Sequence, residues 1–92
     1  MYYDKQGNKI DALTWIKLFD EKGYKRVGYV EKGGISVSTV WLGLDHGFSD
    51  EIHLIFETMV FGLADGSQPQ ERYWTLEEAQ KGHEEMVKKY IK

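Results

Sequence analysis

Two segments of the chain repeat apolar residues at the spacing of a helical face. The first starts after Asp11, a good N-cap, and stops at Gly23, a typical residue just past a helix end. Its predicted inner stripe is Ala12, Trp15, Ile16 and Phe19, widened by Leu13 and Leu18. The second starts at Thr75, which has the capping-box spacing to Glu78. Its predicted inner stripe is Leu76, Ala79, His83, Met86, Val87 and Tyr90.

Between these helices, three segments are rich in apolar and β-branched residues and follow the periodicity of strands. They span residues 24–32, 35–44 and 52–61. Gly33 and Gly34 favour a tight hairpin between the first two segments. The loops after the second and third segments span residues 45–51 and 62–71. Because all the connections are short, we expect an antiparallel three-stranded meander.

These elements predict one α+β domain over residues 1–92, in the order α-β-β-β-α, with both helices on one face of the sheet. The turn-forming residues 6–8 add an N-terminal mini-hairpin, which pairs residues 1–4 with the segment around Lys9. The last strand is apolar on both faces, whereas the helices cover only one. We therefore expect the chain to form a homo-oligomer.

The composition fits a folded protein and excludes several function classes. Hydrophobic residues make up 41% of the chain, which is too many for a disordered protein. The absence of cysteine excludes a disulfide scaffold, thiol catalysis and cysteine-based metal sites. The N-terminus lacks the apolar region of a signal peptide, and no apolar run approaches the ~20 residues of a membrane span. We therefore expect a cytoplasmic protein without a membrane partner.

The charge pattern disfavours nucleic acid as a partner. The net charge is −3, and the basic residues are scattered or matched by nearby acids. Lys88, Lys89 and Lys92 follow several glutamates in the last helical segment, where they complement the helix dipole. Duplex nucleic acid is bound mostly from a basic face, which this sequence does not predict.

Three segments are distinctive beyond their periodicity: STVWLGLDHGF at residues 38–48, LIFETMVFG at 54–62 and RYWTLEEAQKGH at 72–83. With the opening MYYDKQGNKI, they cover nearly the whole chain. In these segments the sequence resembles small uncharacterised proteins of bacteriophages and prophages. The resemblance implies a phage origin, and hence the cytoplasm of a host cell, together with a domain outline. It implies no activity and no active-site residues.

Glu57 is a carboxylate within the apolar last strand, and it has two interpretations. By alternation it shares a face with Ile55, Met59 and Phe61. A carboxylate there must find a partner or have a raised pKa, so it could bind a ligand or act as a general base. The favoured alternative is structural. Its partners would then be Arg26, Lys25 or Arg72 in an ion pair, or Ser38 or Thr39 across the strands.

The histidines offer a second candidate. Asp45 beside His46 could orient an imidazole, and Gly47 permits a turn that exposes it. The sequence contains neither the serine elbow nor the cysteine that nucleophilic catalysis would need, so we predict no catalytic residue. A metal site would need His46, His53, His83 and Glu57 to converge. Scattered histidines are far more often structural, so we predict no metal and no cofactor, and we expect His83 to be a hydrogen-bonded core histidine.

The third candidate is Arg72, Tyr73 and Trp74, just before the last helix. An aromatic ring could stack on a base while Arg72 binds phosphate at the helix N-terminus. Two glutamates in the first turn would repel phosphate, and the alternative is that the aromatic rings clamp the helix onto the sheet. Within that helix, glycine at position 82 lowers the stability of the helix by about 1 kcal/mol relative to alanine. Gly82 therefore marks either the close approach of another backbone or a position that simply tolerates glycine.

Taken together, these candidates predict a ligand site rather than an enzyme. The predicted ligand-binding residues are Trp41, His46, Glu57, Arg72, Tyr73 and Trp74. We expect a phage accessory protein that antagonises a host defence process by binding and sequestering a small nucleotide-like signal molecule. The alternative is a protein-interaction module that blocks a host protein and has no small-molecule site. An enzyme is least favoured, because it would need Glu57, His46 and His83 to converge.

Overall fold

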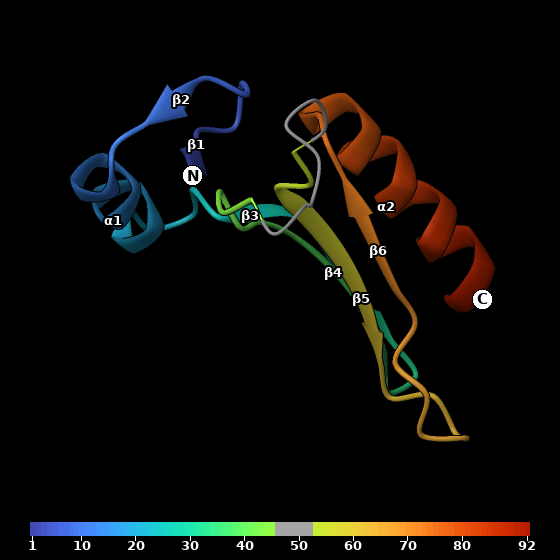
Figure 1. Ribbon diagram of the computed structural model, residues 1–92. Helices are drawn as coiled ribbons and strands as arrows, with labels where there is room; N and C mark the ends of the chain where they lie inside the picture. The colour runs from blue at the N-terminus through green and yellow to red at the C-terminus, as the bar shows by residue number, and fades with distance from the viewer. Residues whose placement is uncertain (46–52) are drawn as a thin grey trace.

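The computed structural model describes residues 1–45 and 53–92 and has an α+β fold, as the sequence predicts (Figure 1). In chain order its elements are β1 (Tyr2–Tyr3), β2 (Lys9–Ile10), α1 (Ala12–Asp20), β3 (Arg26–Lys32), β4 (Ile35–Trp41), β5 (Phe56–Phe61), β6 (Gln70–Tyr73) and α2 (Leu76–Tyr90). Strands β1 and β2 form the expected N-terminal hairpin. The N-cap predictions are confirmed, since the side chain of Asp11 caps α1 and Thr75 forms a capping box with Glu78. The predicted stop at Gly23 was too late, because α1 ends at Asp20 with Glu21 as its C-cap.

The main sheet has four antiparallel strands in the order β3-β4-β5-β6, so the predicted three-stranded meander was one strand short. The first half of the additional strand lies within the segment predicted as a loop at residues 62–71, and its second half follows that segment. Four mostly polar residues carry no strand periodicity of their own. They form a strand because the edge of β5 offers unpaired backbone groups, and the register pairs Glu57 with Arg72 and Phe56 with Tyr73.

Strands β4 and β5 are shorter than predicted because the chain turns at Gly43. This glycine has a φ of +67°, and the amide groups of Leu42 and Gly43 both donate to the carbonyl of Ile55. The amide of Tyr3 then donates to the carbonyl of Gly43 at 2.9 Å. The N-terminal hairpin is thereby attached to the end of β4, beside the main sheet.

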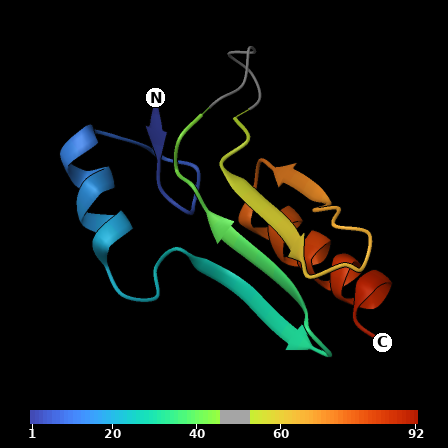
Figure 2. The same ribbon diagram turned by 90° about the horizontal axis from the view of Figure 1, so that it is seen from below.

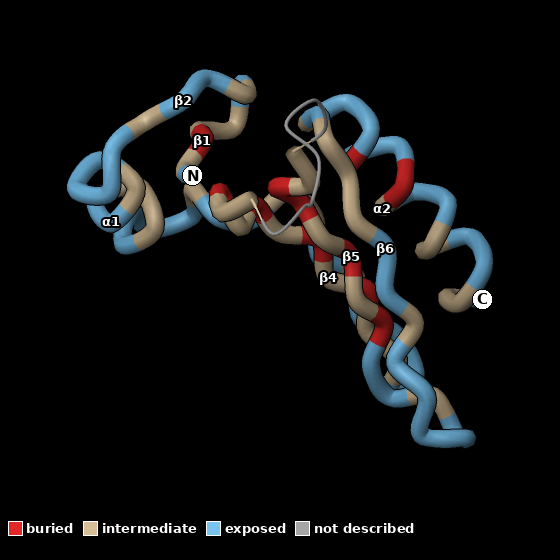
Figure 3. The backbone as a smooth tube through the Cα atoms, viewed as in Figure 1, coloured by how far each residue is buried: buried red, intermediate tan, exposed pale blue. Residues whose placement is uncertain are grey.

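Helix α2 covers one face of the sheet and contacts all four strands (Figures 1 and 2). The buried side chains of that face come from alternate positions of β4 and β5, as Figure 3 shows. They are Val37, Thr39, Trp41, Phe56, Thr58 and Val60. Ala79 and Gly82 are the buried residues of α2, so the helix approaches the strands through small residues.

Helix α1 does not share that face, and the expectation of two helices on one sheet face was wrong. It lies beyond the end of the sheet, against β1 (Figure 2). The indole of Trp15 donates to the carbonyl of Leu42 at 2.9 Å, and Phe19 packs near the ring of Trp41. The predicted inner stripe is also rotated, because Leu13 is 71% and Ile16 is 48% exposed. The small hairpin offers α1 only a narrow surface on which to pack.

The other face of the sheet is uncovered by any helix of the described residues. We call it the open face. The strand register places on it Arg26, Tyr29, Glu31, Ser36, Ser38, Val40, Glu57, Met59, Phe61, Gln70 and Arg72. Tyr29 is 44% and Phe61 is 37% exposed, which leaves an apolar surface on a domain of this size. No helix in residues 1–45 and 53–92 is both long and apolar enough to span a bilayer.

Candidate functional site

The structure separates the residues that the sequence suggested as one ligand site. Trp41 is fully buried in the core, where its indole donates to the carbonyl of Tyr3 at 3.0 Å. Glu57 and Arg72 lie on the open face, whereas Tyr73 lies on the face covered by α2. Trp74 lines a cleft that none of these four predicted residues lines. The prediction for His46 lies outside the described residues.

Glu57 has the structural partner that the sequence favoured. The Nε of Arg72 donates to its Oε2 at 3.0 Å across the β5–β6 pair, and Gln70 donates to the same oxygen at 2.5 Å. The carboxylate is therefore satisfied by charge and by hydrogen bonds. The ion-pair interpretation of Glu57 is confirmed, and Arg72 is its partner.

His83 is the hydrogen-bonded core histidine that the sequence predicted. Its Nδ1 lies 2.7 Å from the hydroxyl of Thr39, which in turn bonds the hydroxyl of Thr58 at 2.5 Å. Burial lowers the pKa of His83 by disfavouring the charged imidazolium. His83 and Glu57 lie on opposite faces of the sheet, so they do not converge as the enzyme interpretation required.

A cleft of about 360 Å³ lies where the N-terminal hairpin meets the start of α2. Its lining residues are Lys5, Gln6, Gly7, Trp74, Thr75, Leu76 and Glu77. Gly7 has a φ of +84°, and a Cβ at this position would lie 3.8 Å from the indole of Trp74. The two walls are thus close together at Gly7, and the cleft is formed by segments far apart in the sequence.

Local hydrogen bonds hold the hairpin wall of this cleft in place. Asp4 Oδ1 accepts from the amides of Gln6 and Asn8 at 3.0 and 2.9 Å, which fixes the turn. The amide of Lys5 donates to the hydroxyl of Tyr24, and its Nζ donates to the carbonyl of Arg26 at 3.2 Å. Burial lowers the pKa of Lys5. The hairpin wall is therefore tied to Tyr24 and to the first residue of β3.

The opposite wall is held by Trp74, which lies between β6 and the N-cap Thr75. The capping box fixes the backbone on its helix side. On its other side the indole packs edge-on against two rings, with centroid distances of 5.1 Å to His53 and 6.4 Å to Tyr3. Trp74 is half-buried, so it has one supported side while it lines the cleft.

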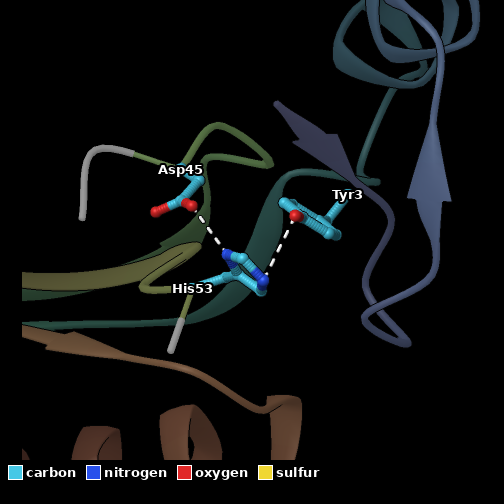
Figure 4. A network of polar contacts seen from close by, with 3 residues as sticks. All are labelled: Tyr3, Asp45 and His53. Atoms are coloured by element: carbon cyan, nitrogen blue, oxygen red, sulfur yellow. Dashed lines mark hydrogen bonds and ion pairs between the residues drawn. The ribbon is translucent and has the colours of Figure 1, made fainter. Parts of the chain in front are cut away.

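Behind Trp74, three side chains form a polar chain (Figure 4). His53 Nδ1 lies 2.6 Å from Asp45 Oδ2, and His53 Nε2 lies 3.2 Å from the hydroxyl of Tyr3. A carboxylate only accepts, so Nδ1 of His53 donates to Asp45, and Nε2 forms the hydrogen bond with the hydroxyl of Tyr3. Asp45 thus contacts the imidazole of His53, which the sequence did not predict, while the predicted pairing of Asp45 with His46 lies outside the described residues.

None of the known families compared with the chain identifies this site. Scans against family models, curated proteins and solved structures gave no match. The phage resemblance stays a prediction. The geometry of the cleft and of its supports therefore carries the functional argument.

The chemistry of the cleft is that of a planar binding surface with polar edges. Trp74 supplies an aromatic wall, while the Gln6 amide and the Glu77 carboxylate offer hydrogen bonds. Tyr3 and His53 are not among the lining residues, so they support Trp74 rather than touch a ligand. Among the described residues, no three His, Asp or Glu side chains lie close enough to hold a metal ion.

Sequence analysis found Trp74 but missed the residues that complete its surroundings. Tyr3 and His53 are fifty positions apart, and no spacing rule connects them. Gln6 and Gly7 were recognised only as part of a turn, and Lys5 was not singled out. The available signal was Gly7, because a glycine at positive φ permits a backbone to approach an aromatic ring closely.

Proposed function

We propose that the cleft between residues 5–7 and 74–77 binds a planar, nucleotide-like small molecule. The observation that carries this proposal is Trp74, an indole supported from behind by two rings, in the wall of a cleft of about 360 Å³. That volume lies within the range of ligand pockets, roughly 300–1,000 Å³. Stacking of a base on an aromatic side chain contributes about 1–3 kcal/mol.

The indole of Trp74 is already held in place before a ligand binds, which supports its role as the binding surface. The capping box at Thr75 and the contacts with His53 and Tyr3 restrict the indole before any ligand arrives. Little conformational entropy is then lost on binding. Of the five predicted ligand-binding residues that the structure describes, Trp74 alone keeps a ligand role in this proposal, and Lys5, Gln6 and Glu77 join it.

The charges of the cleft favour the base and sugar of a ligand over its phosphate. Glu77 lines the cleft, and its carboxylate accepts from amino or hydroxyl groups. Lys5 is the cationic residue of the lining, but its Nζ is hydrogen-bonded to the carbonyl of Arg26 and lies 4.8 Å from the ring centroid of Tyr24. A nucleoside should therefore bind nearly as well as its phosphorylated form.

Calorimetry with adenosine, AMP, a cyclic nucleotide and ADP-ribose tests this proposal. Trp74→Ala should weaken binding by on the order of tenfold to a hundredfold, whereas Trp74→Phe should retain part of it. Tyr90→Ala is the matched control, since it removes an aromatic ring at the far end of α2. No heat of binding or thermal stabilisation with any of these ligands would remove the proposal.

We further propose that binding serves sequestration by a phage accessory protein that antagonises a host defence process. The resemblance to phage proteins and the stacking surface support this role. Sequestration leaves the ligand chemically unchanged, so ligand released by heat-denaturing the complex should be identical to the ligand added. Recovery of a converted product would contradict sequestration and favour an enzyme.

The open face favours a second candidate, a protein-interaction module that blocks a host protein. Its exposed residues Tyr29 and Phe61 are the specific observation. If this candidate is correct, Phe61→Asp abolishes the host-protein contact and Trp74→Ala does not. We also propose that the chain is a homo-oligomer, because the same uncovered face is available for self-association.

A further inference from the structure

A ladder of three side chains runs along β3 on the open face. The guanidinium of Arg26 lies 4.9 Å from the ring centroid of Tyr29, and the Tyr29 hydroxyl donates to Glu31 Oε2 at 3.2 Å. The aromatic ring thus separates a cation at one end of the strand from an anion at the other. Along β3, the open face therefore has positive charge at its Arg26 end and negative charge at its Glu31 end.

The remainder of the open face is apolar or internally neutral. Val40, Met59 and Phe61 supply its apolar surface, next to Ser36 and Ser38. Glu57 and Arg72 neutralise each other in the ion pair already described. Among the residues that the strand register places on the open face, Arg26 and Glu31 therefore carry the charges that a facing surface must match.

The exposed edge of β3 is poorly suited to pairing with another strand. Arg26, Glu31 and Lys32 are exposed charged residues within this seven-residue strand. Charged side chains on an edge strand oppose edge-to-edge pairing. At β3, the face rather than the edge is therefore the surface available to a partner sheet.

We infer that the open face packs on the open face of a second copy, around a two-fold axis that lies between the sheets and runs perpendicular to the strands. This inference builds on the proposed homo-oligomer and not on the ligand cleft. The axis places β3 on the partner's β3 in the reverse direction. Arg26 then faces the partner's Glu31, Glu31 faces the partner's Arg26, and the two Tyr29 rings meet between them.

The charges select this axis over the other two-fold arrangement of two stacked sheets. An axis parallel to the strands would place β3 over the partner's β6. Arg26 pairs with Val40, which pairs with Glu57 and then Arg72, so these residues lie in one row across the sheet. That arrangement would bring Arg26 against the partner's Arg72, whose charge Glu57 already neutralises, so Arg26 would face no complementary charge. The perpendicular axis instead makes two complementary contacts.

Light scattering and sedimentation equilibrium on charge-reversal variants test the arrangement. Arg26→Glu and Glu31→Arg should each raise the dimer dissociation constant by on the order of tenfold or more, because each opposes like charges. The double variant should restore dimerisation, because it exchanges the two signs. Lys88→Glu on α2 is the matched control and should leave the dimer intact. All four variants alter exposed residues, and circular dichroism verifies that they fold.

Each outcome bears on a separate statement. A wild-type chain that stays monomeric at its highest soluble concentration overturns both the self-association and this arrangement. A dimer that is insensitive to the single reversals, or that the double variant fails to restore, overturns the arrangement alone. A dimer that behaves as expected but binds no nucleotide-like ligand overturns only the proposed function of the cleft.

Discussion

The phenol ring of Tyr73 lies directly against Gly82 of α2. A Cβ added at Gly82 would come within 2.3 Å of three atoms of the Tyr73 side chain, which is far inside contact distance. The glycine therefore marks a close approach, as one interpretation of the sequence held, but the group that approaches is a side chain and not a backbone. Burial also raises the pKa of Tyr73, and the neighbouring Thr58 hydroxyl offsets that rise only in part.

Gly82→Ala should destabilise the protein despite the better helix propensity of alanine. Propensity alone would stabilise the helix by about 1 kcal/mol. Overpacking against Tyr73 should outweigh this gain and lower the free energy of unfolding by about 1–3 kcal/mol. Urea denaturation measures the difference, with Gln80→Ala on the exposed side of α2 as the control. A more stable Gly82→Ala variant would show that the position merely tolerates glycine.

The folded protein should become less stable as the pH decreases, because of the partly buried imidazole of His83. Because burial lowers the pKa of His83 in the folded state, the unfolded chain binds a proton more readily. The contribution is complete above the ordinary imidazole pKa of 6.5 and is lost as the pH falls from there through the lower folded pKa. We expect His83→Asn to show a smaller loss of unfolding free energy than the wild type between about pH 7.5 and about pH 5.5. Equal losses in the two proteins would contradict this account of His83.

Tyr3→Phe should loosen the support behind Trp74 without removing its ring contact. The variant deletes the hydrogen bond between the Tyr3 hydroxyl and Nε2 of His53. The expected cost is about 0.5–1.5 kcal/mol of unfolding free energy. Tyr2→Phe in the same strand is the control, because the Tyr2 ring packs on Trp15 instead. If both variants unfold at the same urea concentration as the wild type, the polar chain contributes nothing to stability.

Local sequence signals predicted the parts of the fold that depend on neighbouring residues. The cap at Asp11, the capping box at Thr75 and the hairpin turn at Gly33 and Gly34 each depend on backbone groups a few positions away. Strand β6 could not be predicted in this way. Its mostly polar residues form a strand only because β5 is adjacent in space.

Periodicity also shows which residues share a face but not what that face will contact. This is why the helical segment of α1 was predicted and its place over the sheet was wrong. The same limit applies to the site. The sequence identified Trp74 as a candidate. Tyr3 on the N-terminal hairpin and His53 before β5 are fifty residues apart, and they meet beside Trp74 only in the folded chain.

The central claim is that Trp74 is the ligand surface, and the three indole N–H signals in an NMR spectrum test it most directly. The indoles of Trp15 and Trp41 donate to backbone carbonyls and serve as internal controls, and Trp74→Phe assigns the remaining signal. Titration with adenosine or ADP-ribose should shift the Trp74 signal to saturation and leave the other two nearly unchanged. Saturable binding that leaves the Trp74 signal in place, or the absence of any shift with either ligand, would contradict the account.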